Sequence, residues 1–453
     1  MTDAPLRAWL RDRAHRALAA VPTGLQAEVH LRYHERGLTR FTRNGIHQHV
    51  HDRDGQAYIV LYDADGRMGA ASTNRFDDAG LERAVEQAAA LVPLTAADPD
   101  FPGLAEPQTY PVAPAWDADT ASLTPRDRAQ AVQRIVAHAR AQSLQAAGAL
   151  STQARGVFIA NSRGLEAFTQ GTAAEAIVVM QGDDDAWGRA QDAAVAWARL
   201  DLDALAAEAA DLAVHGRHPR PIEPGEYPVV LASYAVADLL HMLNLHGLSA
   251  RAVQEGRSWL NGRLGQQVFA RQVHLWDDPL SPDTLPVPFD GEGVPKARLE
   301  LVRAGVPLTP VYDRRSAAKA GRASTGHGLP PPARELGARA GHLFLAAGKD
   351  STDALLAAIG RGLFVNRFWY TRLVHPRDCV VTGMTRDGVF WVEGGERAYP
   401  VKNLRFTQSY VTALAEVLAI GATTRLVTSG LGWGGTRAPA LALPAFRFTG
   451  RTV

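Results

Sequence analysis

The spacing of apolar and polar residues divides the first half of the chain into helices and short strands. Apolar residues recur at helical spacing from Pro5 to Ala20, which predicts an amphipathic helix. The period then becomes that of strands, and Asn-Gly and Asp-Gly pairs supply the positive φ angles that hairpin turns require. The predicted strands of this antiparallel meander are Ala27–Tyr33, Leu38–Thr42, Ile46–His51, Gln56–Tyr62 and Arg67–Ser72, with turns at Arg36-Gly37, Asn44-Gly45, Asp54-Gly55 and Asp65-Gly66.

A second set of helices and strands follows in the same half. Asp77 is predicted to cap a helix that ends near Leu91, and a longer helix is expected from Arg126 to Ala147. Further strands are expected at Leu150–Ala160, Gly164–Gln170, Ala174–Met180 and Ala186–Trp197, before a helix over Asp201–Val214.

The segment His215–Pro228 holds four prolines and little apolar content, which is typical of a domain boundary. We therefore predict an N-terminal domain of residues 1–218 and a C-terminal domain of residues 219–453. In the second domain we expect helices near Ser233–Leu245 and Ser409–Leu418. Its predicted strands are Leu363–Leu373, Val380–Met384, Val389–Val392, Arg397–Lys402 and Ala442–Thr449. The fold class is α+β, with a curved antiparallel N-terminal sheet carrying helices and a larger, mostly antiparallel C-terminal β domain with helices.

Composition and charge narrow the classes of function. The 48 basic and 47 acidic residues leave a formal charge of +1, so no net field attracts nucleic acid or an anionic membrane. Met1–Arg16 is charged throughout, unlike a signal peptide, and no apolar run of about 18 residues predicts a membrane span. We expect a cytoplasmic protein with no direct nucleic-acid partner. The single cysteine, Cys379, excludes an intramolecular disulfide and a Cys-rich zinc site.

The pattern closest to a metal site lies on the helix predicted to open the second half, where His241 and His246 are five residues apart. Imidazole is the commonest metal ligand in proteins. Zinc-peptidase helices place two histidines four residues apart with a Glu beside the first as general base. A spacing of five residues puts the rings about 140° apart on an ideal helix, so a shared ion would need a locally widened turn. The alternative is one packed and one surface histidine. Met242, beside the first histidine, cannot take a proton from water.

Three weaker candidates have simpler explanations beside them. His47, His49 and His51 alternate on one face of a predicted strand, where they form either a metal-chelating row or a solvated polar face. Cys379 is expected to be a packed thiol rather than a nucleophile. The glycine-rich segment 430–435 does not run from a strand into a helix, so an adaptable loop is expected rather than a phosphate cradle.

Two acidic turns form a further candidate. Asp277 and Asp278 precede a proline, and Asp290 and Glu292 alternate with glycines. Four carboxylates in two turns could bind a cation or act as acid and base. The alternative is that the side chains form Asx turns that shape their own loops.

A series of short motifs runs through both halves of the chain. They are Asn44-Gly45, Gly66–Thr73, Asn161–Gly164, Glu255–Ser258, Asp277–Pro279, Phe289–Pro295, Tyr312–Ala317, Ser324–Gly326 and Arg386–Gly388. Their order and spacing resemble the TldD/PmbA family, also called TldD/TldE. Members of this family are known as modulators of DNA gyrase and as metallopeptidases. The resemblance covers nearly the whole chain.

The resemblance also indicates which branch of the family is the nearer one. In the TldD type the helix carries His-Glu-x-x-x-His, two zinc ligands with the Glu as base, and a Cys near the C-terminus is a further ligand. His241 and His246 match the two histidines and are candidate vestigial metal ligands. Met242 stands at the position of the Glu, and no cysteine follows Cys379. The chain therefore resembles the TldE/PmbA type, with a degenerate motif and no catalytic residue.

The function implied by the resemblance is that of a non-catalytic subunit. It would pair with a TldD-type catalytic subunit, which carries the zinc, and together they would degrade unfolded or flexible peptides. No cofactor is expected in this chain, and a homodimer is the alternative assembly. One alternative function is a metallopeptidase with a rebuilt site in which Asp290 or Glu292 replaces the lost groups. Another is a peptide-binding or scaffold protein. The resemblance further implies a barrel-like C-terminal domain with the His241 helix near its cleft.

Overall fold

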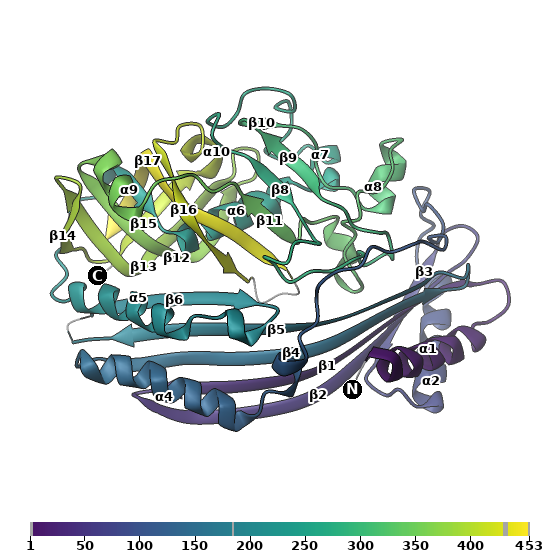
Figure 1. Ribbon diagram of the computed structural model, residues 1–453. Coiled ribbons are helices and arrows are strands. Elements are labelled where there is room, and N and C mark those ends of the chain that lie inside the picture. Colours follow the sequence, from purple (N-terminus) through teal and green to yellow (C-terminus); the bar gives the residue numbers. More distant parts are fainter. Residues whose placement is uncertain (1–2, 184, 429–433, 452–453) are drawn as a thin grey trace.

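The two halves of the chain form two β-sheets that lie against each other (Figure 1). The computed structural model describes residues 3–183, 185–428 and 434–451. A six-stranded antiparallel sheet comes from the first half and an eleven-stranded mixed sheet from the second. The predicted α+β class, with an antiparallel N-terminal sheet and a larger C-terminal sheet, is confirmed.

The strand order of the first sheet is β3-β2-β1-β4-β5-β6. Its strands are β1 (Gln26–Thr42), β2 (Gly45–Tyr62), β3 (Met68–Thr73), β4 (Gln145–Asn161), β5 (Glu166–Gln181) and β6 (Trp187–Ala194). The helices of this half are α1 (Asp3–Ala19), α2 (Asp78–Leu91), α3 (Ala118–Ser122), α4 (Pro125–Ala141) and α5 (Leu202–His215), with short 3₁₀ helices η1 (Val92–Leu94) and η2 (Trp197–Arg199). The Asp77 carboxylate caps α2 as predicted, because it accepts a hydrogen bond from the Gly80 amide at 2.8 Å.

The two faces of this sheet have different neighbours because side chains alternate along each strand. On one face, Val29 and Leu31 of β1 pack with Leu10 of α1 and Leu81 of α2. The intervening residues, such as His30, lie on the opposite face, which is turned toward the C-terminal half. One face is therefore an apolar core and the other lines a boundary between the halves.

Two predicted turns are wrong because Gly37 and Gly55 lie inside the continuous strands β1 and β2. A Cβ at Gly37 would lie 2.5 Å from the guanidinium carbon of Arg128, and one at Gly55 would lie 2.4 Å from the ring of Phe76. These glycines make room for packed side chains rather than for turns. The turn predicted at Asp65-Gly66 is confirmed. The turn predicted at Asn44-Gly45 lies one residue earlier, at Arg43 and Asn44, whose φ angles are 49° and 59°.

Two predicted helices are too long. α4 ends at Ala141, and the backbone reverses at Ser143, whose φ is 54°. Residues 145–147 pair with residues 179–181 of β5, so strand pairing overrides the helical preference of the alanines there. The helix predicted near Ser409–Leu418 is likewise only α10 (Tyr410–Ala413).

Both edge strands of the first sheet carry a glycine against which a helix backbone packs. A Cβ at Gly69 of β3 would lie 2.0 Å from the carbonyl oxygen of Ala88 in α2. One at Gly188 of β6 would lie 1.9 Å from the carbonyl oxygen of Ala209 in α5. Only a residue without a Cβ permits this approach of strand and helix.

We expect Gly188→Ala to lower the free energy of unfolding by about 2 kcal/mol or more, because the new methyl group overlaps a helix backbone that cannot rotate away. Urea unfolding followed by circular dichroism measures the change. Gly45→Ala is the matched control, since a Cβ there meets only the Thr42 carbonyl oxygen at 3.8 Å. Equal midpoints for the two variants would contradict the packing argument.

The second sheet closes partly on itself. Its strand order is β10-β9-β8-β11-β17-β15-β13-β12-β7, with β14 beside β13 and β16 beside β17. Because β17 also pairs with β7, the strands β7, β12, β13, β15 and β17 form a closed five-stranded ring. Most pairs are antiparallel, and β11–β17 and β12–β7 are parallel. The strands are β7 (Gly225–Leu231), β8 (Leu275–Asp277), β9 (Leu299–Arg303), β10 (Val306–Pro307), β11 (His342–Leu345), β12 (Gly362–His375), β13 (Val380–Glu393), β14 (Glu396–Pro400), β15 (Leu404–Ser409), β16 (Ala419–Val427) and β17 (Gly435–Arg451).

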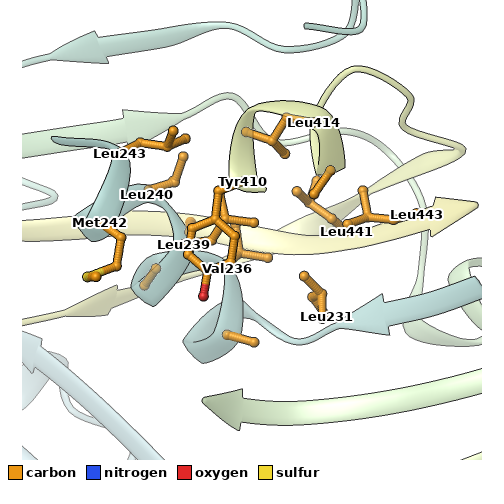
Figure 2. Packing of buried hydrophobic residues seen from close by; sticks show 14 of the residues in the cluster. Leu231, Val236, Leu239, Leu240, Met242, Leu243, Tyr410, Leu414, Leu441 and Leu443 are labelled. Carbon is orange, nitrogen blue, oxygen red and sulfur yellow. The ribbon is translucent and has the colours of Figure 1, made fainter. Parts of the chain in front are cut away.

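The helix α6 (Ser233–Gly247) packs into the core of this half. Leu239, Leu240 and Leu243 lie in one apolar cluster with Tyr410 and Leu441 (Figure 2). The remaining helices are α7 (Ala250–Gln254), α8 (Arg314–Lys319), η3 (Ala333–Leu336) and α9 (Thr352–Ile359). The helix predicted near Ser233–Leu245 is thus confirmed, and its apolar side explains why its position is fixed.

The two halves also share apolar contacts, since Tyr234 of α6 packs in a cluster formed mainly by β4, β5, α4 and α5. The division at residues 218 and 219 remains a prediction. Within the described ranges, none of the helices combines the length and the apolar character that crossing a bilayer requires.

Candidate functional site

The helix α6 places the two candidate metal ligands in different surroundings. Residues 233–247 are α-helical throughout, with no widened turn between His241 and His246. The two imidazoles therefore leave the helix about 140° apart. His241 lines a cavity between the halves, and His246 does not.

Met242, at the position expected for a general base, points into the apolar core. Its side chain is 4% exposed and belongs to the same cluster as Leu239 and Leu243 (Figure 2). It does not line the cavity beside His241. A thioether has no proton-accepting group that could activate water, and here it also faces away from solvent.

The cavity beside His241 has a volume of about 430 Å³ and lies between the first sheet and α6. Residues of β1, β4 and β5 line one side. Residues of α6, of the loops 287–296 and 327–342, and of the start of β17 line the other. The site is thus assembled from both halves of the chain.

The strand register brings basic side chains to the sheet wall of the cavity. Arg32 and His34 are alternate residues of β1, and they pair with Val157 and Arg155 of β4. Period two puts these four side chains on one face of the sheet, and all four line the cavity. Burial lowers the pKa of Arg155, and repulsion from Arg32 lowers it further.

On the opposite wall of the cavity, the backbone of the loop 327–342 is anchored to α6. The Asn244 side-chain amide donates to the Ala340 carbonyl at 2.6 Å, and the Ala340 amide donates to Asn244 Oδ1 at 3.3 Å. These bonds hold Arg339 next to His241.

Burial lowers the pKa of His241, and the charge of Arg339 lowers it further. Burial lowers the pKa of His246 to about 4, and His241 and Arg339 add to the effect. Because the pKa of each ring is lowered, both histidines are neutral at pH 7.

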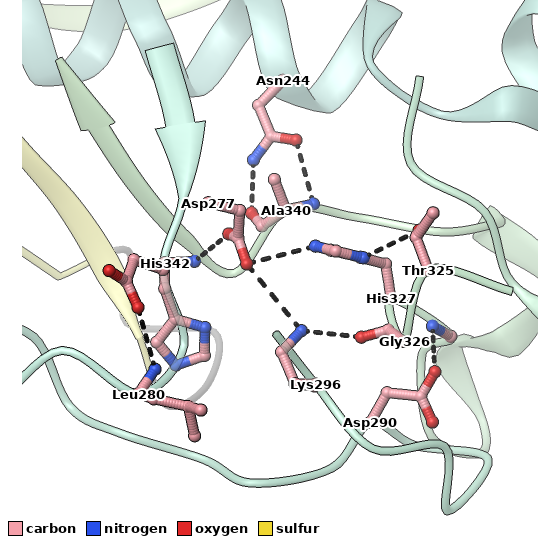
Figure 3. A network of polar contacts seen from close by, with 12 residues as sticks. Asn244, Asp277, Leu280, Asp290, Lys296, Thr325, Gly326, His327, Ala340 and His342 are labelled. Atoms are coloured by element: carbon pink, nitrogen blue, oxygen red, sulfur yellow. Dashed lines mark hydrogen bonds and ion pairs between the residues drawn. The ribbon is translucent and has the colours of Figure 1, made fainter. Parts of the chain in front are cut away.

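A buried polar network supports the floor of the cavity (Figure 3). Asp277 Oδ1 accepts from the His342 amide at 2.6 Å, and Oδ2 lies 3.1 Å from His327 Nε2 and 4.0 Å from Lys296 Nζ. Lys296 also donates to the Gly326 carbonyl at 2.9 Å. Burial by itself would raise the pKa of Asp277, but Lys296 and then His327 hold it well below its usual range. Asp277 is therefore a structural anion that orders three cavity-lining residues.

Two of the four carboxylates in the acidic turns, Asp278 and Asp290, have the loop-forming role. Asp290 Oδ1 accepts from the amides of Glu292 and Val294 at 2.9 Å each, and Oδ2 accepts from the Gly328 amide at 2.7 Å. Asp278 accepts from the Leu280 amide at 3.3 Å. The Asx-turn interpretation is confirmed for these two residues.

Glu292 and Glu28 lie at a second junction of the halves. Burial, and then the nearby Asp290, raise the pKa of Glu292 to about 8. Glu28 of β1 forms an ion pair with Arg334 at 2.8 Å, and Arg334 also donates to the Tyr62 hydroxyl at 2.7 Å. Burial would raise the pKa of Glu28, but the charge of Arg334 and the hydrogen bond from His30 together outweigh it and lower the pKa to about 2. The pair thus joins the first sheet to the loop that carries Arg339.

The residues present do not fit a catalytic zinc centre, which needs three protein ligands around one ion. No group of three or more His, Cys, Asp or Glu side chains that could hold a metal occurs in the described part of the chain. Cys379 is fully buried, and burial raises the pKa of its thiol to about 12. The oxygens of Asp290 already accept backbone N–H groups. We assign no chemical step to a metal held by this chain, and the vestigial-ligand interpretation of His241 and His246 remains a prediction.

The other predicted groups lie elsewhere. His47, His49 and His51 are on the exposed part of β2, where His49 Nδ1 lies 2.9 Å from Thr39 Oγ1 and His51 Nε2 lies 2.8 Å from Glu35 Oε1. They form a solvated strand face. Of the glycine-rich segment 430–435, residues 430–433 lie outside the described residues.

The sequence reasoning missed the arginines of the cavity. A usable signal was present in β1, where Glu28, His30, Arg32 and His34 occupy alternate positions of a strand whose other face is apolar. A row of charged side chains opposite an apolar face indicates that the charged face lines a polar boundary inside the protein rather than facing solvent. Arg339 had no such signal, because it lies in an irregular loop.

Comparisons with known proteins identify a family and several related chains. Residues 224–450 match the family model described as the PmbA/TldA metallopeptidase C-terminal domain. A metalloprotease of Methanothermobacter thermautotrophicus is 24% identical over 241 residues, which is 53% of each chain. Metalloprotease PmbA of Escherichia coli O157:H7 is 25% identical over 404 residues, 85% of each chain. The chain therefore spans about half the length of the first relative and most of the second.

Two solved structures have the same fold. That of TldE from Thermococcus kodakarensis gives a TM-score of 0.86 at 20% identity, covering 98% of this chain and 100% of the other. A protein of Thermotoga maritima MSB8, whose name proposes a role as modulator of a DNA gyrase, gives a TM-score of 0.84 at 21% identity. The match covers 97% of this chain and 100% of the Thermotoga chain.

Proposed function

Because the chain belongs to the PmbA/TldD metallopeptidase family, we propose that it is a TldE-type subunit without hydrolytic activity of its own. It would act with a TldD-type catalytic chain, which carries the zinc, on unfolded or flexible peptides in the cytoplasm. A homodimer is the alternative assembly. Direct contact with nucleic acid is not part of the proposal, because a formal charge of +1 supplies no general attraction to phosphates.

The observation that carries the proposal is the environment of Met242. Hydrolysis by a zinc peptidase needs a carboxylate that takes a proton from metal-bound water. In this chain that position holds a thioether, and the side chain is 4% exposed in the core. His241 is the neighbouring residue that reaches the cavity, and no carboxylate among the described residues is hydrogen-bonded to it. The geometry supports a chain that contributes to a peptide-binding cleft but not to bond cleavage.

The test is peptide cleavage with and without the partner. We expect the purified chain to leave an unstructured peptide intact and to contain far less than one zinc per chain. Adding the TldD-type protein of the same genome should give cleavage that exceeds the activity of that protein alone. Mass spectrometry of the peptide products and elemental analysis of each chain give the two readouts.

The outcome that would refute the proposal is equally specific. Cleavage by the single chain, with one zinc per chain and loss of both on His241→Ala, would instead support the rebuilt metallopeptidase site. His47→Ala, on the exposed part of β2, is the matched histidine control.

A further inference from the structure

The cavity beside His241 has an excess of positive charge. Among the described residues, four cationic side chains line it, Arg32, Arg155, Lys296 and Arg339, against one carboxylate, Asp290. The oxygens of Asp290 are occupied by three backbone amides. The excess is therefore not neutralised by the lining itself.

Two of the arginines have no ion-pair partner within the described residues. Lys296 is matched by Asp277 at 4.0 Å and by a carbonyl group. Arg32 instead lies over the ring of Tyr58, 5.7 Å from its centroid, and no carboxylate is paired with it or with Arg339. Both side chains are partly buried, and burial lowers the pKa of each. Partial desolvation of a guanidinium group is unfavourable, and an anion bound beside it offsets this cost.

His342 also lines this cavity, and its ring has a hydrogen-bond acceptor without a partner among the described residues. It is 3% exposed, and its Nε2 lies 3.0 Å from the Leu285 carbonyl, which can only accept, so Nε2 carries the proton. Burial lowers the pKa of the ring to about 4, so Nδ1 keeps a free lone pair at pH 7. This buried Nδ1 has no partner among the described residues. Such an atom is satisfied by an N–H donor.

The lining also has an apolar part, which includes Val287, Phe289, Leu329 and Pro330. A ligand that satisfies the cavity therefore combines a negative group, an N–H donor and an apolar part. A peptide has all three, and a carboxylate can bind a guanidinium group through two parallel hydrogen bonds. A free inorganic anion would leave the apolar wall and Nδ1 unused.

We propose that this cavity binds the carboxylate of a peptide through Arg32 and Arg339, with Arg155 contributing to the same positive surface. The inference rests on the proposed function, because it names the chemical group of the peptide that this subunit recognises. The carboxylate has two sources, the C-terminus of the peptide or an acidic side chain.

Calorimetric titration of the full chain, without partner, tests the inference. The probes are an N-acetylated apolar tetrapeptide with a free C-terminal acid, its C-terminal amide, and an amide that contains one Glu. We expect the acid to bind at least about tenfold more tightly than the plain amide, because charge-assisted hydrogen bonds are lost in the amide. If the Glu-containing amide binds as tightly as the acid, side-chain carboxylates are a source as well, and recognition of a carboxylate is still supported.

Variants assign the binding to the cavity. Arg339→Gln is expected to weaken binding of the acid about tenfold and to leave binding of the amide unchanged. Arg339→Lys, which keeps the charge, should restore part of the loss. Arg53→Gln is the matched control, since Arg53 is 65% exposed on β2 and does not line the cavity. Circular dichroism verifies that each variant is folded.

Equal affinity for acid and amide in the wild-type chain would overturn the inference without any variant. So would inorganic phosphate that displaces the acid at equal concentration. The outcome is separable from that of the cleavage test, because binding is measured on the single chain. Selective binding without cleavage in the presence of the partner would refute only the proposed function.

Discussion

Met242→Glu is expected to lower the free energy of unfolding by about 4 kcal/mol or more and to leave the chain unable to hydrolyse peptides. The side chain at this position is 4% exposed among leucines of α6 and the surrounding ring. A carboxylate there loses its hydration and finds no cation, so it becomes protonated and remains an unsatisfied polar group. It would also not reach the cavity that His241 lines.

Met242→Leu is the matched control, because the two side chains have similar volumes and the swap should change stability by less than about 1.5 kcal/mol. Urea unfolding gives the stability difference, and a peptide-cleavage assay with added zinc gives the activity. A Met242→Glu protein that is as stable as the wild type and gains zinc-dependent cleavage would show that the position faces a working site. In that case the core position of Met242 would not explain the missing activity.

Arg334→Met is expected to lower the free energy of unfolding by about 3–5 kcal/mol, because it leaves the buried Glu28 carboxylate without its cation. Glu28 is 4% exposed, and Arg334 is its ion-pair partner at 2.8 Å. The pair joins β1 to the loop of the C-terminal half, so its loss weakens the contact between the two sheets. Urea unfolding monitored by tryptophan fluorescence measures the change.

Two further variants separate this effect from simple loss of a surface charge. Arg303→Met removes an ion pair with Glu300 in which both side chains are exposed, and it should change stability by less than about 1 kcal/mol. Glu28→Gln combined with Arg334→Met removes both charges and should be more stable than Arg334→Met alone. If Arg334→Met and Arg303→Met unfold at the same urea concentration, the pair does not hold the halves together.

The elements that were predicted well are those whose signals are local. Capping by Asp77 and the apolar spacing of α2, α5 and α6 depend on residues within one or two helical turns. The tight turn before Gly45 also has a local signal, since Arg43 and Asn44 adopt the positive φ angles that such a turn requires. Errors arose where a distant partner decides the outcome. Gly37 faces the Arg128 side chain of α4, and residues 145–147 pair with β5.

The chemistry of the site divides in the same way. The sequence by itself determined that Met242 cannot act as a base and that two histidines five residues apart are poorly placed for one ion. These statements depend only on the side chain and on helical geometry. The tertiary structure decided that Met242 is a core residue and that the cavity is basic. Arg32 and Arg339 are 307 positions apart in sequence. Only the packing of α6 and of the loop 327–342 against the first sheet brings them to one cavity.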